Sequence, residues 1–229
     1  TWSWENGAPT EVKDSGEYTV LFTPTYSYLY YGATEKAKVT VTPRDIGNKD
    51  ITFPSGDSFV YTGNVIIPYI YGEYKYDENI EALELHEDED YTLIYPEDAI
   101  NVGKKTITVT GHGNFGGTTE LEYEIIPCAI APTVELTPTE YTYDGSKKTP
   151  KATVTVNGTE LTEGKDFKVE YSNNENAEDG AKAIIPAMGN YSFETVEKSF
   201  SISKANSVID TAPAANNFTY DSLSHYLVT

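Results

Sequence analysis

Apolar and polar residues alternate along several short segments of this chain. The pattern is clearest in 121–125 and 167–171, and it recurs in 18–22 and 154–156. Successive side chains of a strand point to opposite faces, so this period of two predicts strands with one apolar and one polar face. Such strands are typical of antiparallel sheets that cover a core on one side and meet water on the other.

Turn-forming residues separate these segments. They include Asn157-Gly158, Glu163-Gly164, Gly111–Gly113 and Gly189-Asn190. Several short strands with such turns in each stretch of about 80 residues predict an all-β fold. We expect tandem small antiparallel β-sandwich domains of immunoglobulin-like type in an elongated array. The alternative is a series of β-grasp-like units.

One segment, Glu78–His86, interrupts the strand pattern. Ile80 and Leu83 form part of a helical apolar face, but Leu85 does not lie on it. The segment is therefore interpreted either as a short helix or as a long loop insertion.

Internal similarity indicates a repeated unit. An aromatic residue, any residue, a tyrosine and then a turn residue occur in 59–63, 141–145 and 218–222. Further matches follow in the same order: 90–95 with 166–171, Asn101-Val102-Gly103 with Asn176-Ala177 and Gly180, 113–115 with 189–191, and 123–125 with 200–202. Recurrence at a nearly constant offset predicts tandem repeats.

These matches divide the chain into four parts. Residues 1–43 are predicted to be the C-terminal half of a β repeat, because 14–20 resembles the stretch that begins at Asn101. Complete repeats are predicted at 44–127 and 128–204, and 205–229 is predicted to begin a further one. The joints between them are short, so neighbouring repeats should abut.

The third part resembles the YDG- and MBG-type tandem repeat domains of bacterial cell-surface proteins. The motifs that resemble the family are Tyr143-Asp144-Gly145, 161–167, 171–177 and Gly189-Asn190-Tyr191. The resemblance extends more loosely to 59–125. It implies a secreted or wall-anchored protein of Firmicutes type, in which the repeats serve as stalks or adhesin arms. It implies no catalytic residues.

Charge and composition narrow the classes of partner. The chain has 16 Lys and Arg against 36 Asp and Glu, a formal net charge of −20. Nucleic acids and anionic membranes are bound through Lys and Arg, so this balance argues against both. No apolar run approaches the roughly 20 residues of a membrane-spanning helix. We expect an extracellular protein, secreted or attached to the cell wall.

Residues suited to catalysis or metal binding are sparse. Cys128 is the only cysteine, it stands beside Pro127, and no histidine is near it in the sequence. His86 and His112 fall in the predicted repeat 44–127 and His225 falls in the last part, so no predicted repeat holds three histidines, which argues against a zinc site. The acidic run 87–90 offers oxygen ligands for calcium but lacks the spacing of a calcium loop. We expect no catalytic residue, no metal ligand and no cofactor, with calcium as a minor alternative.

Tyrosines offer the candidate ligand site. Two clusters stand out among 19 tyrosines: Tyr26, Tyr28 and Tyr30, and then Tyr69, Tyr71, Tyr74 and Tyr76. An exposed tyrosine face can stack on sugar rings or anchor a protein. The alternative is that these rings cover the small cores. The sequence thus predicts a non-catalytic stalk module that contacts the other repeats of its own chain. An adhesin-type module that binds glycan or a host or cell-surface protein is the second hypothesis.

Overall fold

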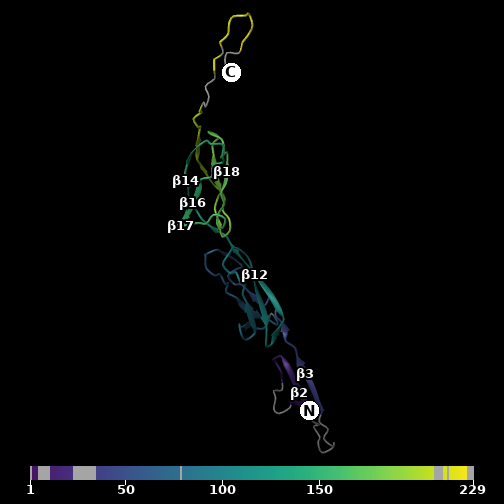
Figure 1. The fold of residues 1–229 in the computed structure, drawn as a ribbon. Helices are drawn as coiled ribbons and strands as arrows, with labels where there is room; N and C mark the ends of the chain where they lie inside the picture. Colours follow the sequence, from purple (N-terminus) through teal and green to yellow (C-terminus); the bar gives the residue numbers. More distant parts are fainter. Residues whose placement is uncertain are drawn as a thin grey trace, which may run out of the picture. The chain divides into compact units, whose positions relative to one another are not determined.

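The computed structural model describes residues 2–4, 11–22, 35–77, 79–208, 214–215 and 217–225. Every regular element in these residues is a strand, so the predicted all-β class is confirmed. The chain divides into two compact units, whose strands are drawn in Figure 1. Unit 1 is Thr1–Ala129 with Gly189–Ser192, and unit 2 is Ile130–Met188 with Phe193–Thr229.

The first part of unit 1 is a sheet of three antiparallel strands. They are β1 (Trp2–Trp4), β2 (Gly16–Phe22) and β3 (Glu35–Val41), in the order β1-β2-β3. β2 pairs with β3 along its whole length, from Gly16 opposite Val41 to Phe22 opposite Glu35. The alternation predicted for 18–22 therefore belongs to the central strand of this sheet.

The second part of unit 1 contains a four-stranded sheet. Its strands are β6 (Ser58–Val60), β12 (Thr118–Ile126), β10 (Gly103–Gly111) and β9 (Tyr91–Ile94), in that order across the sheet. β10 runs antiparallel to both β9 and β12. Leu121, Tyr123 and Ile125 are buried on one face of β12, while Glu122 and Glu124 between them are exposed. The predicted alternation of β12 is confirmed.

A three-stranded antiparallel sheet accompanies it. Its strands are β5 (Ile51–Thr52), β7 (Tyr71–Tyr74) and β8 (Leu83–Leu85). The helix alternative for Glu78–His86 is wrong, because the described residues 79–86 contain no helix, Leu83–Leu85 pairs with β7 and Leu85 is buried. A Cβ at Gly72 would lie 2.9 Å from the Leu85 Cβ, so only glycine fits where β7 faces this leucine.

Side chains from both sheets of this part share one buried cluster. It contains Ile51 of β5 and Leu85 of β8 together with Tyr91 of β9, Val109 of β10 and Leu121 of β12. A second cluster centres on Tyr123 and two buried isoleucines. Burial of such apolar side chains is the main favourable term in folding.

The strands of unit 2 are arranged much like those of the second part of unit 1, but a three-stranded and a two-stranded sheet take the place of its four-stranded sheet. β14 (Thr133–Thr137), β16 (Lys151–Val156) and β17 (Thr159–Glu160) form one sheet, in the order β14-β16-β17. β18 (Glu170–Ser172), β19 (Lys182–Ile185) and β21 (Val196–Ser199) form another, in the order β18-β19-β21. β15 (Glu140–Thr142) pairs with β22 (Ser201–Ser203), as β6 pairs with the end of β12.

Among the described strands, four pairs are parallel, which the prediction of antiparallel sheets did not include. Two of them are β6 with β12 and β15 with β22. The other two join β4 (Arg44–Asp45) to β11 (Phe115–Gly116), and β13 (Cys128–Ala129) to β20 (Tyr191–Ser192). Alternation of side chains reports which face is buried, but it does not report strand direction, so these pairs escaped prediction.

Candidate functional site

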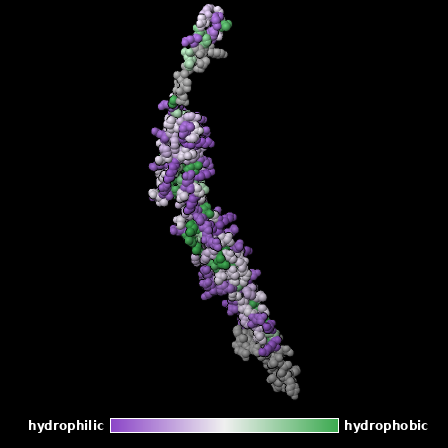
Figure 2. All heavy atoms as spheres, viewed as in Figure 1, coloured by the Kyte–Doolittle hydropathy of each residue, from purple (hydrophilic) through white to green (hydrophobic). Residues whose placement is uncertain are grey.

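Polar side chains cover most of the visible face of both units, and strongly apolar residues gather in a few places (Figure 2). The first predicted tyrosine cluster, Tyr26, Tyr28 and Tyr30, lies outside the described residues. The second cluster, at 69–76, is described and can be compared with the prediction.

The structure divides the second cluster by role. The Tyr74 ring packs edge-on against Phe115, with 5.8 Å between the ring centroids, and the Arg44 guanidinium lies 4.2 Å from the Tyr74 centroid. Tyr71 is half-buried, and its hydroxyl donates a 3.1 Å hydrogen bond to Glu73, which raises the pKa of Tyr71. Tyr74 is therefore committed to packing.

Tyr69 and Tyr76 remain open to solvent. Their exposed fractions are 67% and 82%. Neither ring has a ring–ring contact with another described residue. Of the four tyrosines in this cluster, these two could meet a ligand without disturbing the core.

A charged hollow that the sequence did not reveal lies beside Tyr71. Asp50 is buried and accepts hydrogen bonds from the Arg44 guanidinium (2.8 and 3.2 Å) and from the Gly47 N–H (2.8 Å). The hollow has a volume of about 380 Å³, and Lys49 lies in its wall. The Asp50–Arg44 pair fixes the chain just before β5, so we assign it a structural role.

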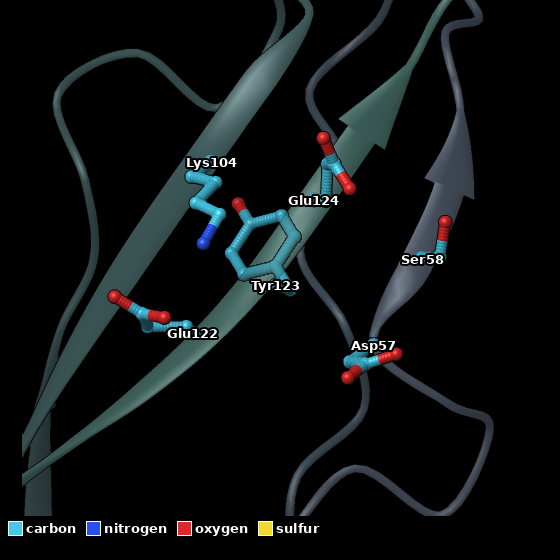
Figure 3. Close-up of a pocket in the computed structure, with 6 residues that line it drawn as sticks. All are labelled: Asp57, Ser58, Lys104, Glu122, Tyr123 and Glu124. Atoms are coloured by element: carbon cyan, nitrogen blue, oxygen red, sulfur yellow. The ribbon is translucent and has the colours of Figure 1, made fainter.

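A second hollow, of about 220 Å³, lies where β6, β10 and β12 meet (Figure 3). Glu122 and Glu124 project from β12, and Lys104 on β10 stands opposite Glu124. Asp57 and Ser58 close the other side. Both glutamates belong to the exposed face of β12, so the hollow is part of the solvated surface that the alternation predicts.

The acidic run 87–90 forms a turn. The Asp90 carboxylate accepts a 3.0 Å hydrogen bond from the His86 N–H, and Asp166 does the same for Thr162 in unit 2, at 2.9 Å. Asp88 has a φ of 69°, and the matching Gly164 has a φ of 81°. Across the described residues, no group of three or more His, Cys, Asp or Glu side chains is placed to hold a metal ion.

The Tyr143-Asp144-Gly145 motif builds a local turn, as predicted. The Asp144 carboxylate accepts hydrogen bonds from the N–H and the hydroxyl of Ser146 (2.9 and 2.6 Å). It also accepts one from the buried Lys148 ammonium. The Lys148 bond is the first cause of the lowered pKa of Asp144, and the two Ser146 bonds lower this pKa further. Gly145 supplies the positive φ, 79°.

The Gly-Asn-aromatic motif makes a more specific contact. In unit 1, the side-chain oxygen of Asn114 accepts a 2.6 Å hydrogen bond from the Ser15 N–H. The Asn114 amide nitrogen donates to the Asp14 carboxylate at 2.8 Å. The Ser15 hydroxyl donates to the Gly113 carbonyl, also at 2.6 Å. We name this set, Asn114 with Asp14 and Ser15, the first clasp.

The second copy of the motif repeats the two bonds of the asparagine amide, also within unit 1. The side-chain oxygen of Asn190 accepts a 2.8 Å hydrogen bond from the Val102 N–H, and its amide nitrogen donates to the Asn101 side-chain oxygen at 2.9 Å. Asn190 is buried. We name this set, Asn190 with Asn101 and Val102, the second clasp. A buried amide with both ends satisfied stabilises one arrangement of the chain over others.

Backbone contacts extend both clasps. The Arg44 N–H donates to the Asn114 carbonyl, and the Cys128 N–H donates to the Asn190 carbonyl, both at 3.0 Å. These bonds begin the parallel pairs β4–β11 and β13–β20. The sequence predicted no catalytic role for Cys128. Its backbone N–H extends the second clasp by its bond to the Asn190 carbonyl.

Glycine is needed at the start of each motif. Gly113 and Gly189 have φ values of 67° and 65°, a conformation that costs other L-residues about 1–2 kcal/mol. The sequence revealed this motif as a turn but not its partners. A signal for them was present in the sequence. Each Gly-Asn-aromatic motif follows, one predicted repeat later, a matching stretch, Asp14-Ser15-Gly16 or Asn101-Val102-Gly103.

No described segment forms a helix long and apolar enough to cross a bilayer. No protein-family model matches the chain. Searches of curated proteins and of solved structures find no match either.

Proposed function

We propose that this chain is a non-catalytic, extracellular repeat module of a bacterial surface protein, built from immunoglobulin-like β-sandwich repeats that space or present other domains. The observation behind the proposal is that the asparagine amide makes two equivalent bonds in the first and in the second clasp. In each clasp the asparagine belongs to one predicted repeat, and the turn that it holds belongs to the predicted repeat before it. A spacer needs contacts at its joints that add to the short connections, and the clasps supply such contacts.

Protease resistance at the joint tests this role. Asn190→Ala removes both side-chain bonds of the second clasp and leaves the Val102 N–H without its partner. We expect proteinase K to cut within 126–130 at least tenfold faster in this variant than in the unaltered chain, because the segment opens more often. Cleavage is followed by mass spectrometry of the intact chain and its fragments.

Asn64→Ala is the matched control, because Asn64 is exposed and its side chain has no hydrogen-bond partner among the described residues. It should leave the cutting rate unchanged. Equal rates at 126–130 for the unaltered chain and Asn190→Ala would refute the spacer proposal in this form.

The second candidate function is binding of glycan or protein through exposed tyrosines. Its support is the exposure of Tyr69 and Tyr76. On a glycan array and in pull-downs from host-cell surface extracts, a binding module should give a reproducible signal. The double variant Tyr69→Ala/Tyr76→Ala should abolish that signal without lowering the melting temperature.

Tyr74→Ala separates binding from folding, because Tyr74 packs on Phe115 and under Arg44. We expect it to lower the free energy of unfolding by about 2–3 kcal/mol, the scale of losing a partly buried aromatic ring. A binding signal that persists in the double variant would remove these two tyrosines from the ligand site.

A further inference from the structure

Unit 2 has a counterpart of the two clasped turns. In the sequence match, Asn176 and Ala177 correspond to Asn101 and Val102. Their position in the sheet agrees, because the Glu178 N–H donates to the Ile202 carbonyl just as the chain enters the strands around β19. Both clasped turns in unit 1 likewise end where β2 and β10 begin.

This third turn is empty in the described part of the chain. Neither the Asn176 side chain nor the Ala177 N–H has a hydrogen-bond partner there, and Asn176 is exposed. In the first and second clasps, the groups at these two positions bind an asparagine side chain. The donor and the acceptor that an asparagine amide would satisfy are therefore both free at the third turn.

Tyr143 lies nearby and, within the described residues, also has no ring partner. Tyr143 corresponds to Tyr61, since the Tyr143 N–H donates to Ser203 and the Tyr61 N–H to Ile126, each at 2.9 Å. Tyr61 packs edge-on against Tyr191, the aromatic residue of the second Gly-Asn-aromatic motif, at 5.6 Å between centroids. Tyr143 is 40% exposed and contacts no other ring among the described residues.

The surface around the turn is hollowed. A cavity of about 360 Å³ is lined by Asn176, Gly180, Phe200 and Ser203, among others. It lies on the side of the turn where β22 ends. The space, the free amide partners and the exposed ring occur together at one end of unit 2.

We propose that the Asn176–Ala177 turn, together with Tyr143, is a docking site for the Gly-Asn-aromatic turn of a further repeat of the same kind. The inference rests on the proposed tandem arrangement, and its argument is that two equivalent turns of this chain are occupied in this way. Residues 205–229 contain no glycine, so they do not supply the motif themselves. The incoming asparagine would accept from the Ala177 N–H and donate to the Asn176 side-chain oxygen.

An extended chain tests the proposal. Residues 1–204 are followed directly by a second copy of 128–204, whose Gly-Asn-Tyr turn then has only the Asn176–Ala177 turn to clasp. Hydrogen exchange of the Ala177 N–H is measured by NMR. We expect exchange at least tenfold slower than in the unextended chain, because the amide becomes hydrogen-bonded.

The matched variant changes the asparagine of the added copy, at the position of Asn190, to alanine. Exchange at Ala177 should return to the rate in the unextended chain, while the buried Ile185 amide stays protected and reports that unit 2 is folded. Unchanged exchange at Ala177 in the extended chain would overturn the docking site. Protection of the Val102 N–H in that same sample would show that the second clasp, and with it the proposed function, still stands.

Discussion

Individual carboxylates in this chain stabilise turns by accepting hydrogen bonds from backbone N–H groups. The Asp98 side chain accepts hydrogen bonds from the N–H groups of Ile100 and Asn101, both at 3.0 Å, and from the buried Lys105 ammonium, also at 3.0 Å. The backbone bonds are the first cause of a pKa well below the usual range for Asp98, and Lys105 adds to them. Asn101 is part of the second clasp, so Asp98 stabilises the turn that presents Asn101 to Asn190.

This arrangement predicts a stability that falls with acid. The pKa of Asp98 in the folded chain is lowered, so its contribution is complete above the unfolded value of about 3.9 and is lost as pH falls toward the folded value. Asp98→Asn should therefore be less stable than the unaltered chain at pH 6, and the gap should narrow between pH 4 and pH 2. Urea unfolding followed by circular dichroism measures it.

Glu97→Gln is the neighbouring control, because the Glu97 side chain is exposed and has no hydrogen-bond partner among the described residues. Its stability should run parallel to that of the unaltered chain across the same pH range. A constant gap between Asp98→Asn and the unaltered chain from pH 6 to pH 2 would contradict the assigned role of Asp98.

At the scale of elements, the sequence predicted strands and turns better than partners. Alternation located β2, β12 and β16, and the Asn157-Gly158 pair located the hairpin between β16 and β17. Of the predicted strand 167–171, only Glu170 and Tyr171 lie in a strand, β18. Alternation did not reveal the parallel pairs, because parallel pairing depends on which distant strand lies alongside. The same limit explains why the second clasp was not predicted. The motif Gly189-Asn190-Tyr191 was visible in the sequence, but the partners of Asn190 lie 88 and 89 residues away.

The tight turn between β16 and β17 can be tested by a single substitution. Asn157 and Gly158 have φ values of 51° and 82°, the two positive values that a tight two-residue turn of this kind requires. No atom lies within 4 Å of a Cβ built on Gly158, so Gly158→Ala introduces backbone strain without a clash. We expect the free energy of unfolding to fall by about 1 kcal/mol. Thermal unfolding measures the change.

Asn157→Gly is the partner variant, because glycine also accepts a positive φ. It should leave the melting temperature within about 1–2 °C of the original value, since asparagine already tolerates this conformation. If Gly158→Ala proves as stable as the unaltered chain, the turn does not constrain β16 and β17 in the way described.

The whole molecule is dominated by negative charge. With 36 acidic and 16 basic residues, self-repulsion opposes the compact state at low salt. Raising sodium chloride from 0.01 to 0.15 M shortens the screening length from about 30 Å to about 8 Å. We expect the melting temperature to rise by about 2–4 °C over this range, as measured by differential scanning calorimetry.

Choline chloride is the control for this effect, because its cation is too bulky for a tight carboxylate site. Equal rises in the two salts indicate screening. A melting temperature that falls as either salt is added would mean that the surface ion pairs, such as Lys182 with Glu197, outweigh the repulsion.

The parallel pair of β15 and β22 has a mechanical consequence for unit 2. These strands lie near the two ends of the unit's sequence, so tension on the chain pulls them in opposite directions along their own length. Their ladder continues in the bond from the Ser201 N–H to Thr139 and in the one from the Tyr143 N–H to Ser203. All of these bonds are stretched together in shear and none can be peeled open singly, so stretching should meet its main resistance at this seam.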